Sequence, residues 1–366
     1  MTDLKYFCDL AQKGLKKGED AVIIQKWIVS DIPTMRLEFV EHQCEERINM
    51  CQQTLFDYIE TDVSALQEPL HLAEYDFNDI FITTDDLIQE HSKYSLAVLG
   101  DAISVLRKIK SGVVDLIFAD APYNIGKDFG NNQDKWNSVE DYIAWCKIWL
   151  DECMRVLKDN GTLYFMTATQ HMPYLDIYMS QKYHVLCRIV WTYDSSGVQS
   201  KKMFGSLYEP ILMVTKSSNS RYTFNGQDVL VEAKTGAQRK LIDYRKDPPQ
   251  PYNTQKVPGN VWTFPRVRFK MDEYENHPTQ KPESLLERII KASSNEGDLI
   301  LDPFAGSFTT SAVAVSLNRR AIGIDINEEY FRIGLRRTGI ASTYQGESIE
   351  KVKRRKTTAK SKYVRG

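Results

Sequence analysis

The sequence lacks the features of a membrane protein or an exported, disulfide-stabilised protein. No apolar run approaches the length of a transmembrane helix, and residues 1–30 contain neither a basic start nor a continuous apolar stretch. The six cysteines form no C-x-x-C pair, which indicates buried thiols in a reducing compartment rather than a metal site. We therefore expect a cytoplasmic protein without a membrane anchor or a bound metal.

Two signatures of nucleotide binding and one of base modification are also missing. The chain has no P-loop and no G-x-G-x-x-G, since Phe308 stands where the second glycine of that motif would lie. This argues against a nicotinamide dinucleotide as cofactor. The chain also has no Pro-Cys pair, which disfavours methylation of cytosine C5 because that chemistry needs a nucleophilic cysteine.

Charge is distributed unevenly along the 366 residues. Residues 1–92 contain 19 acidic and 7 basic side chains, so the remainder carries a net charge of +10 within a total of −2. Two interpretations stay open for that excess: a surface that meets a polyanion, or an ordinary solvated face. The length predicts one large α/β unit with additions.

From residue 94 onward, strand and helix signals alternate, which is typical of a parallel sheet. We expect helices over residues 102–109 and from 138 to a stop at 159–161. We expect strands over residues 96–99, 113–119, 162–166, 186–193, 211–215, 299–301 and 321–324. The predicted fold class is α/β, a doubly wound and mostly parallel sheet of Rossmann-like type.

Asp120, Ala121, Pro122 and Tyr123 directly follow one of these apolar strands. The carboxylate can accept a hydrogen bond from an exocyclic amino group, while the tyrosine ring stacks on the base that carries it. A backbone carbonyl at Ala121 or Pro122 can accept the second hydrogen of the amine. The alternative interpretation is an ordinary strand-to-loop junction, where Asp and Pro are common.

A second motif resembles a nucleoside-binding loop. Gly306 follows the strand at 299–301 and allows a ligand to approach the backbone, and Ser307 opens the next helix. Asp325 ends the following strand, where an acid can bind the ribose hydroxyls of a nucleoside cofactor.

Between about 194 and 276 the alternation fades, and basic residues are interleaved with aromatic residues and prolines. This composition suits contacts to phosphates and bases. The candidate DNA-binding residues are Lys201, Lys202, Arg239, Lys240, Arg245, Lys246, Arg266 and Arg268.

Taken in order, the motif at 120–123, the segment His277-Pro278-Thr279-Gln280-Lys281-Pro282 and the loop at 304–306 resemble the amino-DNA methyltransferases that use S-adenosylmethionine. Because the catalytic motif comes first and a variable region separates the motifs, the chain is most similar to the beta-order N6-adenine subgroup. The family more often has proline at position 121, and an acid at position 120 favours adenine N6 over cytosine N4.

The resemblance implies a site-specific modification or orphan methylase that acts on double-stranded DNA. It assigns catalysis to residues 120–123, and it leaves open a homodimer and a restriction endonuclease that acts on the same site. It implies cofactor contacts by Asp101, Thr279, Lys281, Asp302, Phe304, Ala305, Gly306, Ser307 and Asp325. The alternatives are an N4-cytosine methyltransferase, an RNA methyltransferase and a non-catalytic DNA-binding protein.

The same reasoning divides the chain into five segments. We expect an acidic helical extension at 1–92, the catalytic half of the methyltransferase domain at 93–194 and a target-recognition region at 195–276. The cofactor-binding half follows at 277–340, and a basic tail occupies 341–366.

Overall fold

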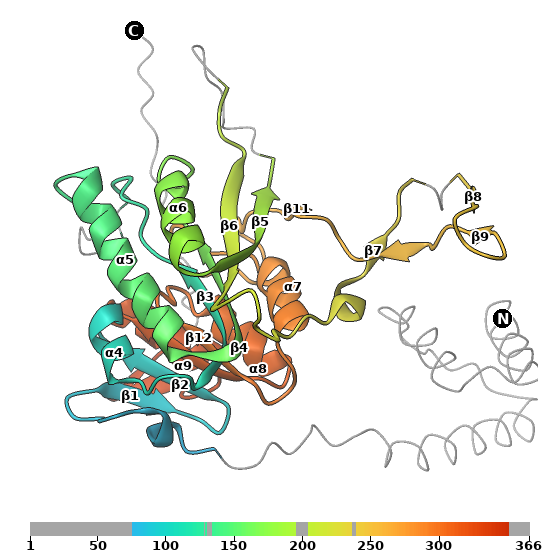
Figure 1. Ribbon diagram of the computed structural model, residues 1–366. Coiled ribbons are helices and arrows are strands. Elements are labelled where there is room, and N and C mark those ends of the chain that lie inside the picture. Colours follow the sequence, from blue (N-terminus) through green and yellow to red (C-terminus); the bar gives the residue numbers. More distant parts are fainter. Residues whose placement is uncertain (1–74, 128, 130–133, 195–203, 236–238, 351–366) are drawn as a thin grey trace, which may run out of the picture. The chain divides into compact units, whose positions relative to one another are not determined.

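A nine-stranded sheet organises the computed structural model, which describes residues 75–127, 129, 134–194, 204–235 and 239–350 (Figure 1). The strand order is β1-β2-β13-β12-β3-β4-β6-β5-β11. The strands are β1 (Ile88–His91), β2 (Ser95–Leu99), β3 (Val114–Asp120), β4 (Leu157–Met166), β5 (His184–Thr192), β6 (Tyr208–Thr215), β11 (Val261–Thr263), β12 (Leu299–Asp302) and β13 (Arg320–Asp325).

Most of the sheet is parallel. Strands β2, β13, β12, β3 and β4 run in one direction, β6 is antiparallel to both of its neighbours, and β1 is antiparallel to β2. Parallel strands require crossover connections, which helices supply here. The predicted doubly wound α/β fold is therefore confirmed.

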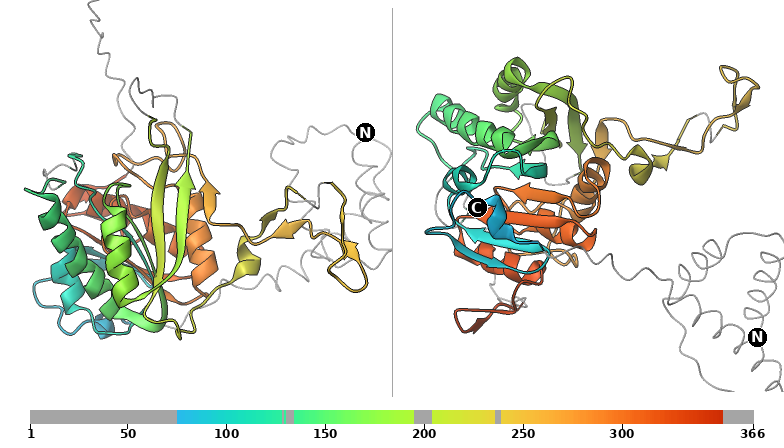
Figure 2. Two further views of the ribbon diagram at one scale, coloured as in Figure 1. Left: turned by 45° about the horizontal axis from the view of Figure 1, so that its top comes forward. Right: turned by 60° about the horizontal axis from the view of Figure 1, so that its bottom comes forward.

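Helices cover both faces of the sheet, as two views show (Figure 2). Alternate residues of a strand point to opposite faces: Ile117 belongs to the core under α4, α5 and α6, while Phe118 belongs to the core under α7 and α8. The helices are α4 (Ala102–Lys108), α5 (Val139–Val156), α6 (Met172–Lys182), α7 (Glu283–Ser293), α8 (Thr309–Ser316) and α9 (Glu328–Arg337). None of the described helices is long and apolar enough to cross a membrane.

Helix α5 begins where the sequence indicated but ends sooner. The Ser138 hydroxyl caps the helix by accepting a hydrogen bond from the backbone N–H of Asp141 at 3.0 Å. The expected stop at 159–161 is wrong, because β4 already begins at Leu157. Gly161 lies inside that strand, where an added Cβ would be 2.8 Å from the carbonyl oxygen of Asp115. A close approach of two backbones, and not a turn, requires this glycine.

The predicted segment boundaries do not coincide with the sheet. Strand β1 lies before residue 92, in the segment expected to be a helical extension, and the only helical element between 75 and 92 is η1 (Phe77–Ile80). Strands β6 and β11 belong to the main sheet although they lie within 195–276. Residues 1–74 and 351–366, where the extension and most of the basic tail were expected, lie outside the described residues.

Several short elements lie outside the main sheet (Figure 1). They are η2 (Gly226–Val229), β7 (Val231–Glu232) with β10 (Gln255–Lys256), β8 (Ile242–Asp243) with β9 (Gln250–Pro251), and β14 (Thr343–Tyr344) with β15 (Glu347–Ser348). Asn225 joins the start of this region to α7, because its backbone N–H donates to the Ala292 carbonyl at 2.7 Å.

Candidate active site

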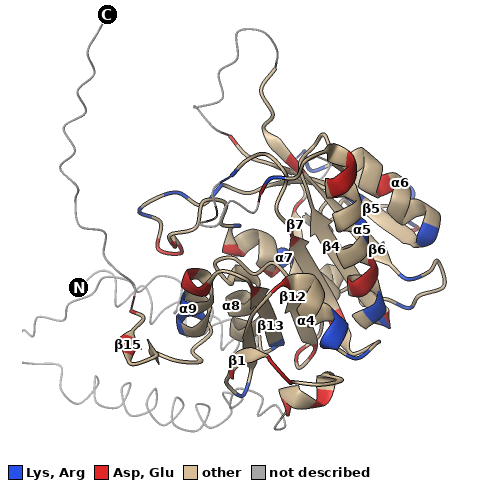
Figure 3. Cartoon of the chain, turned by 90° about the vertical axis from the view of Figure 1, so that its left-hand side faces the viewer, with Lys and Arg blue, Asp and Glu red and all other residues tan. Residues whose placement is uncertain are grey.

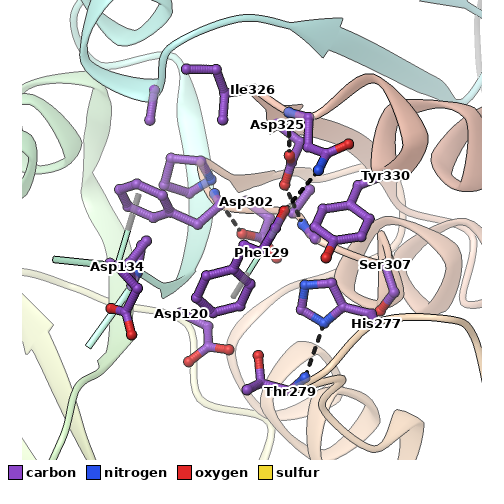
Figure 4. A pocket seen from close by; sticks show the side chains of 18 of the residues that line it. Asp120, Phe129, Asp134, His277, Thr279, Asp302, Ser307, Asp325, Ile326 and Tyr330 are labelled. Atoms are coloured by element: carbon purple, nitrogen blue, oxygen red, sulfur yellow. Dashed lines mark hydrogen bonds between the residues drawn. The ribbon is translucent and has the colours of Figure 1, made fainter. Parts of the chain in front are cut away.

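A cavity of about 520 Å³ lies at the carboxyl ends of the parallel strands. Asp101 follows β2, Asp120 ends β3, Asp302 ends β12 and Asp325 ends β13, and all four line the cavity. Figure 4 shows the side chains of Asp120, Asp302 and Asp325 around this space. Ligands of open α/β sheets bind at this edge, where loops diverge from the strand ends. The fold thus brings the two predicted motifs into one pocket.

The turn that carries the 120–123 motif is held by a buried carboxylate. Asp134 accepts hydrogen bonds from the backbone N–H groups of Asn124, Ile125 and Lys127 at 2.6, 3.1 and 2.7 Å. Asn124 has a φ of 53°, a left-handed conformation that Asn tolerates better than most residues. The sequence analysis did not select Asp134, because a lone Asp in a polar stretch gives no signal of which N–H groups it meets.

Tyr142 on α5 also binds this turn. Its hydroxyl lies 2.9 Å from the Pro122 carbonyl oxygen, to which it donates, and 2.8 Å from the Thr167 hydroxyl. The Pro122 carbonyl therefore already has a partner within the protein. The geometry of this turn is determined by tertiary contacts as well as by proline.

Asp120 lies in a network with three other polar side chains. Its Oδ2 atom is 2.6 Å from the Lys281 ammonium, and its Oδ1 atom accepts a hydrogen bond from the Tyr123 hydroxyl at 2.7 Å. Glu209, on β6, completes the network: its Oε2 atom is 3.0 Å from the Tyr123 hydroxyl and 3.6 Å from the Lys281 ammonium. Glu209 was missed by sequence reasoning, because it belongs to a strand without a motif.

Burial governs the protonation of this network. Burial raises the pKa of Asp120 above its usual range, with Lys281 opposing and Glu209 reinforcing the rise. The pKa of Tyr123 is also raised, by burial and then by the two carboxylates. For Lys281, the carboxylates outweigh burial and raise the pKa. We therefore assign a charged lysine and a neutral tyrosine.

Gly306 forms the other side of the cavity. Its backbone N–H donates to Asp325 Oδ2 at 2.8 Å, and the N–H of Asn327 donates to Oδ1 at 2.8 Å. Gly306 has a φ of 51°, and an added Cβ would lie 2.8 Å from Nε2 of His277. Burial raises the pKa of Asp325 to about 6 and lowers that of His277 to about 3, so the histidine is neutral. His277 packs against Tyr330 and Phe129, as expected for a packing residue rather than a base.

Asp302 sits deeper, beside the start of α8. It accepts hydrogen bonds from the Thr310 hydroxyl at 2.5 Å and from the backbone N–H of Phe304 at 3.0 Å. Burial raises its pKa to about 7. The ring of Phe304 packs edge-on against Trp149 at a centroid distance of 5.1 Å, which fixes the loop against α5.

The remaining predicted cofactor residues also line the cavity. Asp101 caps α4 by accepting from Ser104, while Ala305 and Ser307 are buried in the glycine loop. Thr279 precedes Lys281, and its carbonyl oxygen accepts from the Lys281 ammonium at 3.4 Å. The structure places Lys281 itself beside Asp120, 2.6 Å from its carboxylate.

Two further residues explain how the loop tolerates its sequence. Phe308, which replaces the second glycine of a dinucleotide motif, is fully buried with a φ of 56°, and an added Cβ at Gly323 or Gly334 would collide with its ring. Arg337 on α9 donates to the Ser307 carbonyl and the Thr309 hydroxyl, both at 2.8 Å. The ring of Phe308 thus packs against this loop, and Arg337 binds its backbone.

The predicted DNA-binding residues fall into separate places. Arg266 and Arg268 are exposed near the site: Arg266 lies over the ring of Tyr193 at 4.9 Å, and Arg268 donates to the Asp194 carbonyl. Arg239, Lys240, Arg245 and Lys246 belong to the short-strand region, where Arg245 pairs with Asp243 at 2.8 Å. Lys201 and Lys202 lie outside the described residues.

Basic residues do not predominate on the face formed by α5 and α6. Figure 3 shows acidic and basic residues interspersed along α5 and α6. Ion pairs at this face join Lys182 to Asp151 and Arg188 to Asp176 at 2.7 and 2.6 Å. Opposite charges that neutralise each other offer little to a polyanion.

The strand order, the cavity at the strand ends and the carboxylate and glycine motifs around it define an α/β protein with a ligand site at the carboxyl edge of its sheet. The model of the DNA methylase family matches residues 114–336, and the chain belongs to this family. The family predicted from the motifs is therefore confirmed.

Named relatives agree with this assignment. The chain is 60% identical over 267 residues to DNA adenine methyltransferase YhdJ of Escherichia coli (strain K12), covering 73% of this chain and 90% of that protein. It is 37% identical over 261 residues to Type II methyltransferase M.HpaI of Haemophilus parainfluenzae, covering 70% and 78%. The solved structure of the cytosine-N4-specific PvuII DNA methyltransferase shares the fold, with a TM-score of 0.53, 16% identity and coverage of 70% and 89%.

Proposed function

We propose that this DNA methylase transfers a methyl group from S-adenosylmethionine to the N6 atom of adenine in double-stranded DNA. The observation that carries the proposal is that one cavity contains both the Asp120–Tyr123 motif and the Gly306–Asp325 loop. A reaction between an amine and a nucleoside cofactor needs both partners in one desolvated space.

The cavity has the features that such a cofactor requires. Asp325, at the end of β13, would accept hydrogen bonds from the ribose hydroxyls, and the backbone N–H of Gly306 holds its carboxylate at 2.8 Å. Asp302 provides a buried carboxylate for the amino group of the methionine part, and Phe304 closes the same loop. When bound, S-adenosylmethionine supplies an electrophilic methyl group.

Asp120 and the Ala121 carbonyl would accept the two hydrogens of the adenine amine. We assign Ala121 because the Pro122 carbonyl already accepts a hydrogen bond from Tyr142. These contacts localise the nitrogen lone pair and direct it at the methyl group, so that positioning and electrostatics supply the catalysis. Tyr123 would stack on the flipped base and offset part of the few kcal/mol that flipping costs.

Adenine is favoured over cytosine by two observations. The motif begins with Asp120, and the relative that is 60% identical is named a DNA adenine methyltransferase. Because the substrate is DNA, we propose that the protein acts in the cytoplasm, and that exposed Arg266 and Arg268 contact phosphates beside the cavity. A homodimer and a cognate endonuclease remain predictions.

The test is the identity of the product. Purified protein is incubated with unmethylated duplex DNA and S-adenosylmethionine, and the DNA is digested to nucleosides and analysed by mass spectrometry. The proposal predicts N6-methyladenine. N4-methylcytosine as the product would refute the proposed base, and methylation of RNA in preference to duplex DNA would refute the substrate.

A further inference from the structure

Glu209 is a partly buried carboxylate that the proposed reaction does not use. It lies on β6, opposite Trp191 of β5, and its side chain is 17% exposed. Its Oε2 atom faces the two groups that occupy Asp120, the Tyr123 hydroxyl at 3.0 Å and the Lys281 ammonium at 3.6 Å. Tyr193 also hydrogen-bonds Glu209, and Arg266 acts on Lys281. His277 interacts with Lys281, and Asp302 interacts with Asp120.

The contacts of Asp120 pose a problem for the proposed reaction. Both carboxylate oxygens are engaged, Oδ1 by Tyr123 and Oδ2 by Lys281 at 2.6 Å. An amine that arrives at Asp120 competes with these two groups for the carboxylate. A lysine that stays on the carboxylate also opposes the positive charge that develops on the amine during transfer, and this effect is strong in a buried site.

Glu209 is the second acceptor for both displaced groups. The Tyr123 hydroxyl already shares its proton between Asp120 and Glu209, so it can leave Oδ1 without losing a hydrogen bond. The Lys281 ammonium needs to move by only about 1 Å to reach a normal ion-pair distance from Glu209. With one ammonium between two carboxylates, this cluster of three groups keeps a net charge of −1.

We propose that Glu209 is a positioning residue that receives Lys281 and Tyr123 when the substrate amine binds, which frees Asp120 and keeps this cluster at a net charge of −1. The inference rests on the proposed methylation of an amine. It assigns Lys281 to the acceptor side of the site rather than to the cofactor.

The test compares Glu209→Gln with Glu287→Gln. Glu287 also pairs with a lysine, Lys291, but on the exposed surface of α7. We expect Glu209→Gln to lower the single-turnover rate about tenfold or more, in the range typical for loss of an electrostatic contribution to a transition state. The dissociation constant for S-adenosylmethionine should stay within about twofold, and Glu287→Gln should match the wild type.

The pH profile separates this role from a structural one. The negative charge of Glu209 raises the pKa of Asp120. If Asp120 reacts in its ionised form, Glu209→Gln must shift the acidic limb of the rate profile to lower pH. Glu209→Asp keeps the charge, so it should leave the limb near its wild-type position and recover part of the rate.

A double variant gives the sharpest outcome. Lys281→Met leaves two carboxylates together, and Glu209→Gln leaves a neutral pair, but the double variant again holds a charge of −1 on Asp120. We expect the double variant to turn over faster than either single variant. A rate equal to the product of the two losses would overturn the inference, as would a wild-type rate for Glu209→Gln. Absence of N6-methyladenine with the wild-type protein would instead refute the proposed function.

Discussion

The ammonium of Lys281 and the carboxylate of Asp120 form a buried ion pair, 2.6 Å apart, that joins two distant segments of the chain. The same segment also contains His277, whose ring lies against Gly306. One stretch before α7 therefore touches both the acceptor motif and the cofactor loop.

Binding of the cofactor should depend on pH. Burial raises the pKa of Asp302 to about 7 and that of Asp325 to about 6, so both are partly protonated in the free protein near neutrality. A ribose hydroxyl and an ammonium group prefer the ionised carboxylates. We therefore expect the dissociation constant for S-adenosylmethionine to fall as the pH rises from about 5 to 8. Isothermal titration calorimetry at several pH values measures this dependence.

The control is Asp325→Asn, which should raise that dissociation constant and weaken its dependence on pH. Asp159→Asn, at a side chain that is 98% exposed, should leave both unchanged. The free protein should show the opposite trend in stability. Because the folded state holds these protons more tightly than the unfolded chain, the free energy of unfolding should decrease as the pH rises from about 4 to 7. A dissociation constant for S-adenosylmethionine that does not change between about pH 5 and 8 would contradict the assignment of these carboxylates to the cofactor.

Gly306→Ala tests the close approach in the cofactor loop, with Gly112→Ala as the matched control. Both glycines have positive φ, but an added Cβ meets His277 at Gly306 and nothing within 4 Å at Gly112. The control should lose about 1 kcal/mol of stability from backbone strain alone. Gly306→Ala should lose more and raise the cofactor dissociation constant about tenfold; equal behaviour of the two variants in denaturation and binding would contradict the packing described.

Phe308→Ala should destabilise the protein strongly. The ring is fully buried between Gly323 and Gly334, so its removal leaves a cavity that these glycines cannot fill. We expect a loss of about 3–5 kcal/mol in denaturant unfolding. A loss below about 1 kcal/mol would show that the loop does not depend on this ring.

Arg266→Ala tests the proposed phosphate contact beside the site. Removing one such contact should weaken DNA binding and reduce the slope of log K against log salt by about 0.9. Lys216→Ala is the control, because Lys216 follows the opposite end of β6 and pairs with Asp159. An unchanged salt slope in Arg266→Ala, measured by fluorescence anisotropy, would exclude this contact.

Sequence reasoning succeeded where an apolar strand runs directly into a motif. Asp120, Asp302 and Asp325 each end a parallel strand, so the rule that ligands bind at carboxyl ends brought them together without coordinates. The alternation of strands and helices likewise predicted the α/β class.

The same reasoning missed residues whose role depends on tertiary packing. Glu209 lies within β6, and it approaches Tyr123 because β6 is inserted between β4 and β5 and runs antiparallel to both. No local sequence pattern predicted this insertion. Gly161 was interpreted as part of a helix stop because its actual constraint, the backbone of Asp115, is remote in sequence. Helices α6, α7 and α9 were not predicted individually.

The most direct test of the central claim uses Asp120→Asn, with Asp159→Asn as its control, assayed for N6-methyladenine and for binding of S-adenosylmethionine and DNA. If Asp120 holds the reacting amine, methylation by Asp120→Asn should fall about 100-fold or more while both dissociation constants stay within about threefold. Retention of wild-type turnover, or a parallel loss of turnover and of both binding steps, would contradict the account.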